Sequence, residues 1–252
     1  MADHAKNLLQ KKIYEAISKW AHDRNVVSFR NLVDHLSLER ARQILNTPIK
    51  LRDTLYTPLM LAVKFNYVDL VKLLITQYEV DVEQEGTVQF DNYFVDGATA
   101  LWCACSFEFF DIVQILVRIG NADVNHATET LSTPIRAACF NGNRKIVKFL
   151  VDNGADYTIA NKYDNTCLMI ASYNGNLDVV EYLLSLSVDC NLHAKCGSTA
   201  MHFASENGHL DVIKCLLSHG AKSLKNNAGK LSSLPKIKFL SWLTSHILIT
   251  FL

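Results

Sequence analysis

Five threonines recur along the chain at separations of 42, 34, 33 and 33 residues, and each begins a similar short sequence. An alanine follows every one of them five residues later. The threonines are Thr57, Thr99, Thr133, Thr166 and Thr199, and the alanines are Ala62, Ala104, Ala138, Ala171 and Ala204. A unit of about 33 residues cannot bury an apolar face by itself, so copies must stack on their neighbours. This spacing predicts an array with one continuous core.

The sequence of each unit predicts two short helices. The threonine lies at a helix start, where its hydroxyl can accept a hydrogen bond from an unpaired backbone N–H, and proline suits the next position in Pro58 and Pro134. In the last three units a glycine separates the two helices, at Gly142, Gly175 and Gly208. The second helix carries apolar residues on one stripe, which predicts packing onto the next unit.

The period and the Thr-Pro-Leu-like core resemble the ankyrin repeat, and predict an all-α ankyrin-repeat solenoid. Residues 1–52 lack the motif but have helical apolar spacing, and we interpret them as a degenerate N-terminal capping repeat. Residues 53–222 hold five repeats. Residues 223–252 are interpreted as an incomplete sixth repeat with an apolar tail. A stack of this kind presents a long concave surface, typical of proteins that bind other proteins.

The long first spacing contains about nine extra residues, within the segment 84–96. Val88 and Phe90 precede an Asp91-Asn92 turn, and Tyr93 and Val95 follow it, which predicts one enlarged β-hairpin finger. The finger is either a binding element above the groove or an inert insertion of the kind that repeat arrays tolerate.

The end of the chain, residues 237–252, is apolar but contains Lys238 and His246 and is shorter than the ~20 residues that span a bilayer. A membrane anchor is therefore not favoured. A non-repeat tail, or a truncated or misjoined gene model, explains the segment better.

Composition and the motifs that are missing exclude several classes of function. The chain has 25 basic and 25 acidic residues and no basic stripe, which argues against nucleic-acid binding. Its seven cysteines do not form a disulfide framework, and no signal peptide is recognised, so we expect a cytoplasmic, and in part nuclear, protein. Cys190, His193 and Cys196 have zinc-like spacing but lack a fourth ligand, so no metal and no cofactor is expected. Phosphate loops, nucleophile elbows and metalloprotease motifs are missing, which indicates a non-catalytic protein.

Candidate binding residues follow from positions that vary freely in such repeats. The two residues before the inter-helix turn face the concave side, and they include Phe140, Asn141, Tyr173 and Asn174. Aromatic rings supply contact area there and amides supply hydrogen bonds, which favours a peptide-binding groove; ordinary sequence variation is the alternative. Trp102 and Arg136 occupy a site where ankyrin repeats usually have histidine. They are either a stacking plate and a carboxylate clamp or packing residues.

Three stretches, residues 86–102, 132–142 and 160–171, closely resemble the Fem (feminization) proteins. The resemblance covers about residues 55–222 and implies a substrate receptor of a cullin-RING ubiquitin ligase that reads the C-terminal segments of target proteins. Family binding positions correspond to Asp91 and Ser132, whereas Asn141 replaces a second acid, which weakens the expectation of a terminal arginine. No docking region for cullin or elongin is recognised after residue 222, so ligase recruitment needs a further region.

The predicted peptide-binding residues are Phe90, Asp91, Trp102, Ser132, Arg136, Phe140, Asn141, Tyr173 and Asn174. The alternative function is a generic ankyrin scaffold or adaptor without a ligase link.

Overall fold

The computed structural model describes residues 2–23, 26–90 and 93–232. The chain divides into two compact units, one of Met1–Ala137 with Lys148–Ala155 and one of Ala138–Val147 with Asp156–Leu252.

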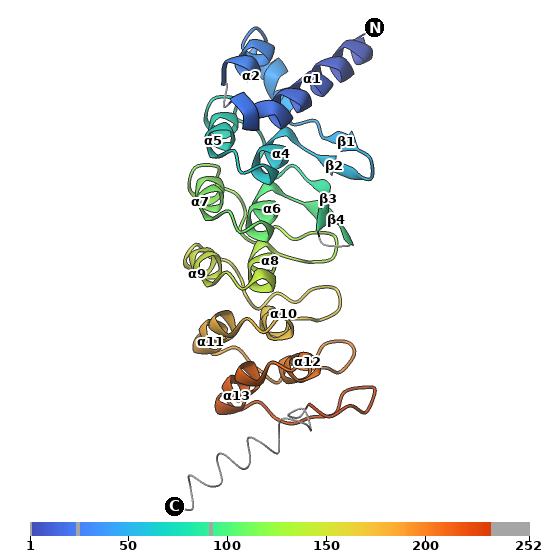
Figure 1. The fold of residues 1–252 in the computed structure, drawn as a ribbon, viewed down its shortest axis with the longest axis vertical. Helices are drawn as coiled ribbons and strands as arrows, with labels where there is room; N and C mark the ends of the chain where they lie inside the picture. Colours follow the sequence, from blue (N-terminus) through green and yellow to red (C-terminus); the bar gives the residue numbers. More distant parts are fainter. Residues whose placement is uncertain (1, 24–25, 91–92, 233–252) are drawn as a thin grey trace, which may run out of the picture. The chain divides into compact units, whose positions relative to one another are not determined.

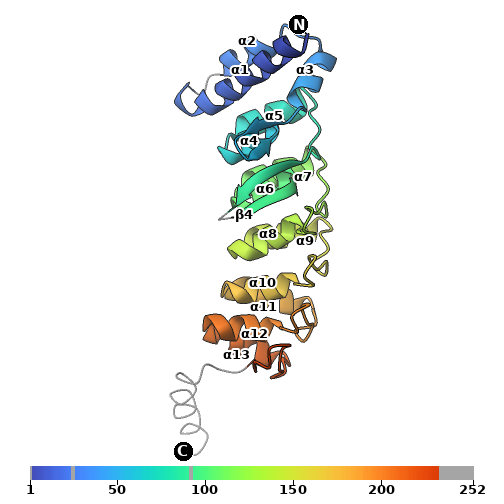
Figure 2. The same cartoon turned by 90° about the vertical axis from the view of Figure 1, so that its right-hand side faces the viewer.

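The first unit contains the helices α1 to α7 and part of the next pair (Figure 1). Their bounds are α1 Ala2–Asp23, α2 Val26–Val33, α3 Leu38–Leu45, α4 Pro58–Lys64, α5 Val68–Thr76, α6 Ala100–Ser106 and α7 Phe110–Arg118. The following helices, α8 Pro134–Asn141 and α9 Arg144–Asp152, carry residues of both units. Figure 2 shows α4 and α6 lying side by side, as expected for the first helices of successive repeats.

The recurrent threonines act as helix caps. The Thr57 hydroxyl accepts a hydrogen bond from the Met60 N–H at 3.1 Å, and the Thr99 hydroxyl accepts one from the Trp102 N–H at 3.3 Å. Such a cap contributes about 1 kcal/mol to helix stability. Thr133 differs, because its buried hydroxyl has no hydrogen-bond partner among the described residues.

A four-stranded antiparallel sheet accompanies these helices. The expectation of an all-α chain with one β-hairpin finger did not include a sheet of four strands. Its strands are β1 Ile49–Leu51, β2 Thr54–Tyr56, β3 Gly86–Phe90 and β4 Tyr93–Ala98, in the order β1-β2-β3-β4. Strands β2 and β3 meet at Leu55 and Thr87. Gly86 permits this approach, because a Cβ there would collide with the Leu55 carbonyl oxygen. The loops of neighbouring repeats thus pair through their backbones.

The second unit contains α10 Cys167–Tyr173, α11 Leu177–Ser185, α12 Ala200–Asn207 and α13 Leu210–Ser218. Side chains tie successive repeats together at the inter-helix turns. The Asn176 amide donates to the carbonyl oxygens of Cys139 and Phe140 at 2.9 and 2.8 Å. Gly142 makes room for this amide, since a Cβ on Gly142 would lie 2.6 Å from the Asn176 Oδ1.

Asn66 and Glu108 occupy the corresponding turns of the first two repeats, with φ of 56° and 63°. Both therefore adopt the left-handed conformation that glycine takes in the later repeats. Asparagine tolerates this conformation, whereas glutamate does not favour it, so the backbone at Glu108 is held by the packing of its repeat.

The beginning of a further loop follows α13, with an antiparallel bridge between Lys225 and Leu231. The proposed capping role of residues 1–52 and the incomplete sixth repeat stay predictions. The tail 237–252 lies outside the described residues. Among the residues that are described, no helix combines the length and the apolar character needed to cross a membrane.

Candidate functional site

The β3–β4 hairpin covers the segment for which an enlarged finger was predicted. Its register pairs Phe90 with Tyr93 and Gln89 with Phe94. The exposed fractions of Tyr93 and Phe94 are 74% and 51%, so two apolar side chains of β4 face solvent. The predicted contact residue Asp91, with Asn92, lies outside the described residues, and its role stays a prediction.

Phe90 and Trp102 pack against each other. Their ring centroids are 5.6 Å apart at an interplanar angle of 84°, an edge-to-face geometry. Pairs of this kind contribute about 0.5–1.5 kcal/mol beyond the apolar area that they bury. Trp102 lies on α6 and is only 4% exposed, so the pair holds the end of β3 against the first helix of the second repeat.

Ser132 completes this contact from the following loop. The Trp102 Nε1–H donates to the Ser132 Oγ at 3.3 Å, and the Ser132 backbone N–H donates to the Thr128 Oγ1 at 3.1 Å. Because the hydroxyl oxygen accepts from tryptophan, the hydroxyl hydrogen remains available to a further acceptor. Phe90, Trp102 and Ser132 form a set that we call the tryptophan platform.

The base of the hairpin is anchored by residues that the sequence analysis did not connect. His126 places its Nδ1 2.8 Å from the Glu83 Oε2 and its Nε2 2.9 Å from the Glu85 Oε1. The Asp123 N–H donates to the other oxygen of Glu83 at 2.8 Å. On the β4 side, the Glu129 N–H donates to the Asp96 carbonyl oxygen at 3.0 Å. The hairpin is therefore attached at the base of both strands to the loop that leads to α8.

Arg136, predicted as a clamp for a carboxylate, lies on α8 with only 7% of its surface exposed. It has interactions of its own within the protein. A ligand carboxylate would have to compete with those interactions, so the clamp stays a prediction.

The other predicted residues belong to the second unit. Tyr173 is 45% exposed and packs edge-to-face on Phe203, with ring centroids 6.2 Å apart. The Asn174 Nδ2 donates to the Phe140 carbonyl oxygen at 2.9 Å, so this amide already links two repeats. Phe140 and Asn141 are half-buried. A peptide-binding role for these four residues stays a prediction.

Cys103 and Cys105 have the features of packed thiols rather than of ligands or nucleophiles. Burial raises the pKa of the Cys103 thiol to about 12 and that of Cys105 further above its ordinary value, so both thiols stay protonated at neutral pH. Across the described part of the chain, no group of three or more His, Cys, Asp or Glu side chains could hold a metal ion.

Comparison with known proteins agrees with the repeat pattern. A family model described as ankyrin repeats (3 copies) matches residues 59–161 and 158–228. The sex-determining protein fem-1 of Caenorhabditis elegans is 41% identical over 110 residues, which are 44% of this chain and 17% of that protein. Protein fem-1 homolog A of Rattus norvegicus is 33% identical over 156 residues, 62% of this chain and 23% of the relative.

A further relative is the ankyrin repeat and SOCS box protein 11 of Danio rerio, 35% identical over 112 residues, which are 44% of this chain and 34% of the relative. The alignments with the two fem-1 relatives thus span less than a quarter of those proteins. The resemblance to Fem proteins is confirmed over part of the chain. This chain belongs to the ankyrin-repeat family, and its repeats are similar to those of the Fem-1 proteins.

Proposed function

We propose that this chain is the recognition part of a substrate receptor for a cullin-RING ubiquitin ligase, and that it binds the C-terminal segment of a target protein. Two findings support a receptor. The repeats are similar to those of Fem-1 proteins, and a further relative is an ankyrin repeat and SOCS box protein. All seven cysteines are free thiols, which suits a cytoplasmic or nuclear protein. The role is binding, without catalysis.

The tryptophan platform is the observation that carries this proposal. It brings together a half-buried phenylalanine ring and a serine hydroxyl, both in contact with Trp102, and the hydroxyl donates to no acceptor within the described part of the chain. An apolar side chain of the target packs on Phe90, and the Ser132 hydroxyl donates to the terminal carboxylate. A hydrogen bond to a charged group contributes about 1.5–3 kcal/mol, so the free chain end is the feature that this arrangement recognises.

As the Fem resemblance and the residue types imply, we expect Asp91 and Asn141 each to favour a basic residue of the target and Arg136 to favour a carboxylate. Phe140, Tyr173 and Asn174, in the second unit, are proposed as further contact residues for the target. Docking to cullin or elongin requires a region beyond the repeats, as is consistent with the small fraction of the Fem-1 relatives that is covered.

The test uses two pools of random peptides that differ only in their ends, one with free carboxylates and one with C-terminal amides. We expect the full chain to capture peptides from the first pool, and amidation of the best peptide to weaken its binding at least about tenfold. Ser132→Ala should reduce affinity for the free-ended peptide, whereas Tyr163→Ala, at an exposed aromatic residue far along the sequence, serves as the matched control.

Equal binding of the free and amidated peptides would refute chain-end recognition. It would favour the generic ankyrin scaffold without a ligase link.

A further inference from the structure

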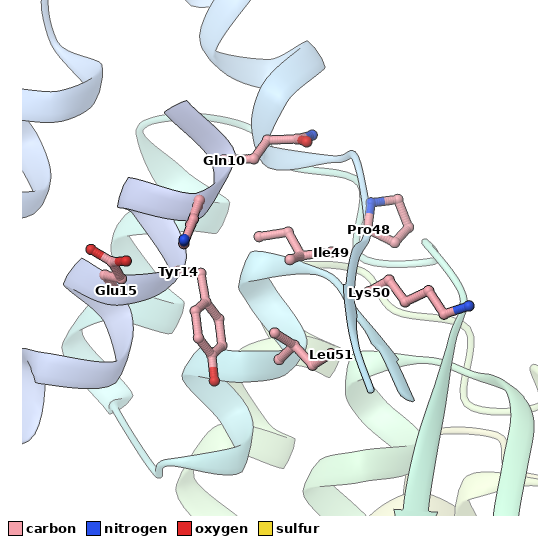
Figure 3. Close-up of a pocket in the computed structure, with 8 residues that line it drawn as sticks. Gln10, Tyr14, Glu15, Pro48, Ile49, Lys50 and Leu51 are labelled. Carbon is pink, nitrogen blue, oxygen red and sulfur yellow. The ribbon is translucent and has the colours of Figure 1, made fainter. Parts of the chain in front are cut away.

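A cavity of about 490 Å³ lies between α1 and β1 (Figure 3), and no residue of the tryptophan platform lines it. Four residues of α1 and four consecutive residues at β1 line it, all in the first unit: Gln10, Lys11, Tyr14, Glu15, Pro48, Ile49, Lys50 and Leu51. Its volume is within the range of pockets that bind ligands.

The cavity follows the outer edge of the sheet. Strand β1 is the first in the order β1-β2-β3-β4, so among the described strands it pairs on one side only. Side chains of consecutive strand residues point to opposite faces, yet all of residues 48–51 line the cavity and no residue of β2 does. A space that reaches both faces of one strand but not its neighbour runs along the free edge. Backbone N–H and C=O groups on such an edge are ready to pair with another strand.

Gln10 supplies a polar group that the protein itself does not satisfy. The side chain is 9% exposed, and its Nε2 has no hydrogen-bond partner among the described residues. In Figure 3 the Gln10 side chain, which lines the cavity, extends from α1 toward the segment that begins at Pro48. An unpaired buried donor is unfavourable, so an incoming carbonyl oxygen at this position would be stabilising.

The two faces of β1 differ in character. Figure 3 shows Ile49 and Leu51 extending toward Tyr14 of α1, whereas Lys50 extends in the opposite direction. An added strand would therefore meet an apolar wall on one face and a lysine ammonium on the other. Two lysines and one carboxylate, Glu15, line the cavity, so its charge favours an acidic ligand.

We propose that the free edge of β1 accepts an extended segment of a partner protein as an additional strand, and that this segment alternates apolar with acidic residues. Its backbone pairs with β1, one carbonyl oxygen accepts from the Gln10 amide, and its acidic side chains lie beside Lys50. Strand addition to a sheet edge is a recurrent mode of peptide recognition, in which the backbone provides affinity and the alternating side chains provide specificity. This site is independent of the proposed chain-end recognition.

The probe is a short fluorescent peptide of alternating valine and glutamate, capped at both ends so that it offers no terminal carboxylate. Fluorescence polarisation with the full chain should show saturable binding. Lys50→Glu should weaken binding at least about threefold and improve binding of the matching valine–lysine peptide, because it reverses a cross-strand charge pair. Lys72→Glu, at another exposed lysine, is the matched control and should leave both affinities unchanged. Gln10→Leu should weaken binding about two- to tenfold without lowering stability.

Backbone pairing is tested with a peptide N-methylated at alternate residues, on the edge that faces β1. Loss of its binding is expected. Equal binding of the methylated peptide, or equal behaviour of the Lys50→Glu and Lys72→Glu variants, would overturn the proposal. Analytical ultracentrifugation covers one further outcome. A dimer that Lys50→Glu dissociates would assign the edge to a second copy of this chain, and would also overturn it.

Discussion

The hydrogen bond between Trp102 and Ser132 makes a quantitative prediction about how the hairpin is held. Trp102 is 4% exposed and its Nε1 is 3.3 Å from the Ser132 Oγ. Ser132→Ala removes the acceptor and leaves a buried N–H unpaired, which should cost about 1–3 kcal/mol of unfolding free energy. Trp102→Phe removes the donor and part of a ring, while the half-buried Ser132 can bind water. It should cost about 1–2 kcal/mol, mostly from lost packing.

The double variant distinguishes a real hydrogen bond from mere proximity. Without the indole N–H, the alanine at position 132 leaves nothing unpaired, so the double variant should be more stable than the sum of the single losses predicts, by about 0.5–1.5 kcal/mol. Urea unfolding followed by circular dichroism measures all four proteins, with equal m-values as the condition for comparing them. Losses that add within about 0.3–0.5 kcal/mol would show that the bond contributes nothing, and the platform would lose its anchor.

Two further predictions concern the repeats. The buried His202 accepts at Nδ1 from the Thr199 N–H at 3.0 Å and contacts the Lys230 carbonyl oxygen through Nε2 at 3.2 Å, whereas in the preceding repeat the Met169 sulfur lies 3.4 Å from the Thr166 nitrogen. His202→Met should therefore lower the unfolding free energy, measured in urea, by about 0.5–1.5 kcal/mol, and His202→Ala should lower it further. Equal losses in the two variants would show that a methionine sulfur does not replace the ring nitrogen at this position. Burial raises the pKa of the Cys103 thiol from 9.0 to about 12, so its contribution to stability is complete below pH 9 and is lost as pH rises toward about 12. Urea titrations at successive pH values should show that Cys103→Ala loses less unfolding free energy over this pH range than the unsubstituted chain does. An identical loss in both proteins would show that ionisation of Cys103 is not its cause.

The spacing of the threonines predicted the ankyrin repeats correctly, because helix capping and apolar periodicity are local properties of the sequence. Thr57 and Thr99 cap their helices as expected, and Gly142 and Gly175 occupy the left-handed turns. The number of strands in the sheet was underestimated. Strands β1 and β2 contain three residues each, too few for a periodic signal, and the pairing of β2 with β3 joins residues more than 30 positions apart.

The sequence predicted which residues form the candidate site, but not which of them contact one another. Phe90, Trp102 and Ser132 were each named as binding residues, yet their mutual packing depends on a hairpin returning to the next repeat and a loop from the repeat after that. The clamp of His126 by Glu83 and Glu85 left no sequence signal, because its partners are about 40 residues apart and no motif requires them.

The sequence by itself determined a stack of helix pairs, since a 33-residue unit with one apolar stripe has no other way to remove that stripe from water. Only the tertiary structure decided which loops pair as strands, which edge remains open at β1 and which hydroxyl meets the indole of Trp102. Strand pairing and the indole–hydroxyl contact are hydrogen bonds between groups that are distant in sequence. The packing of the repeats sets the distances between these groups, and the residue types alone do not specify those distances.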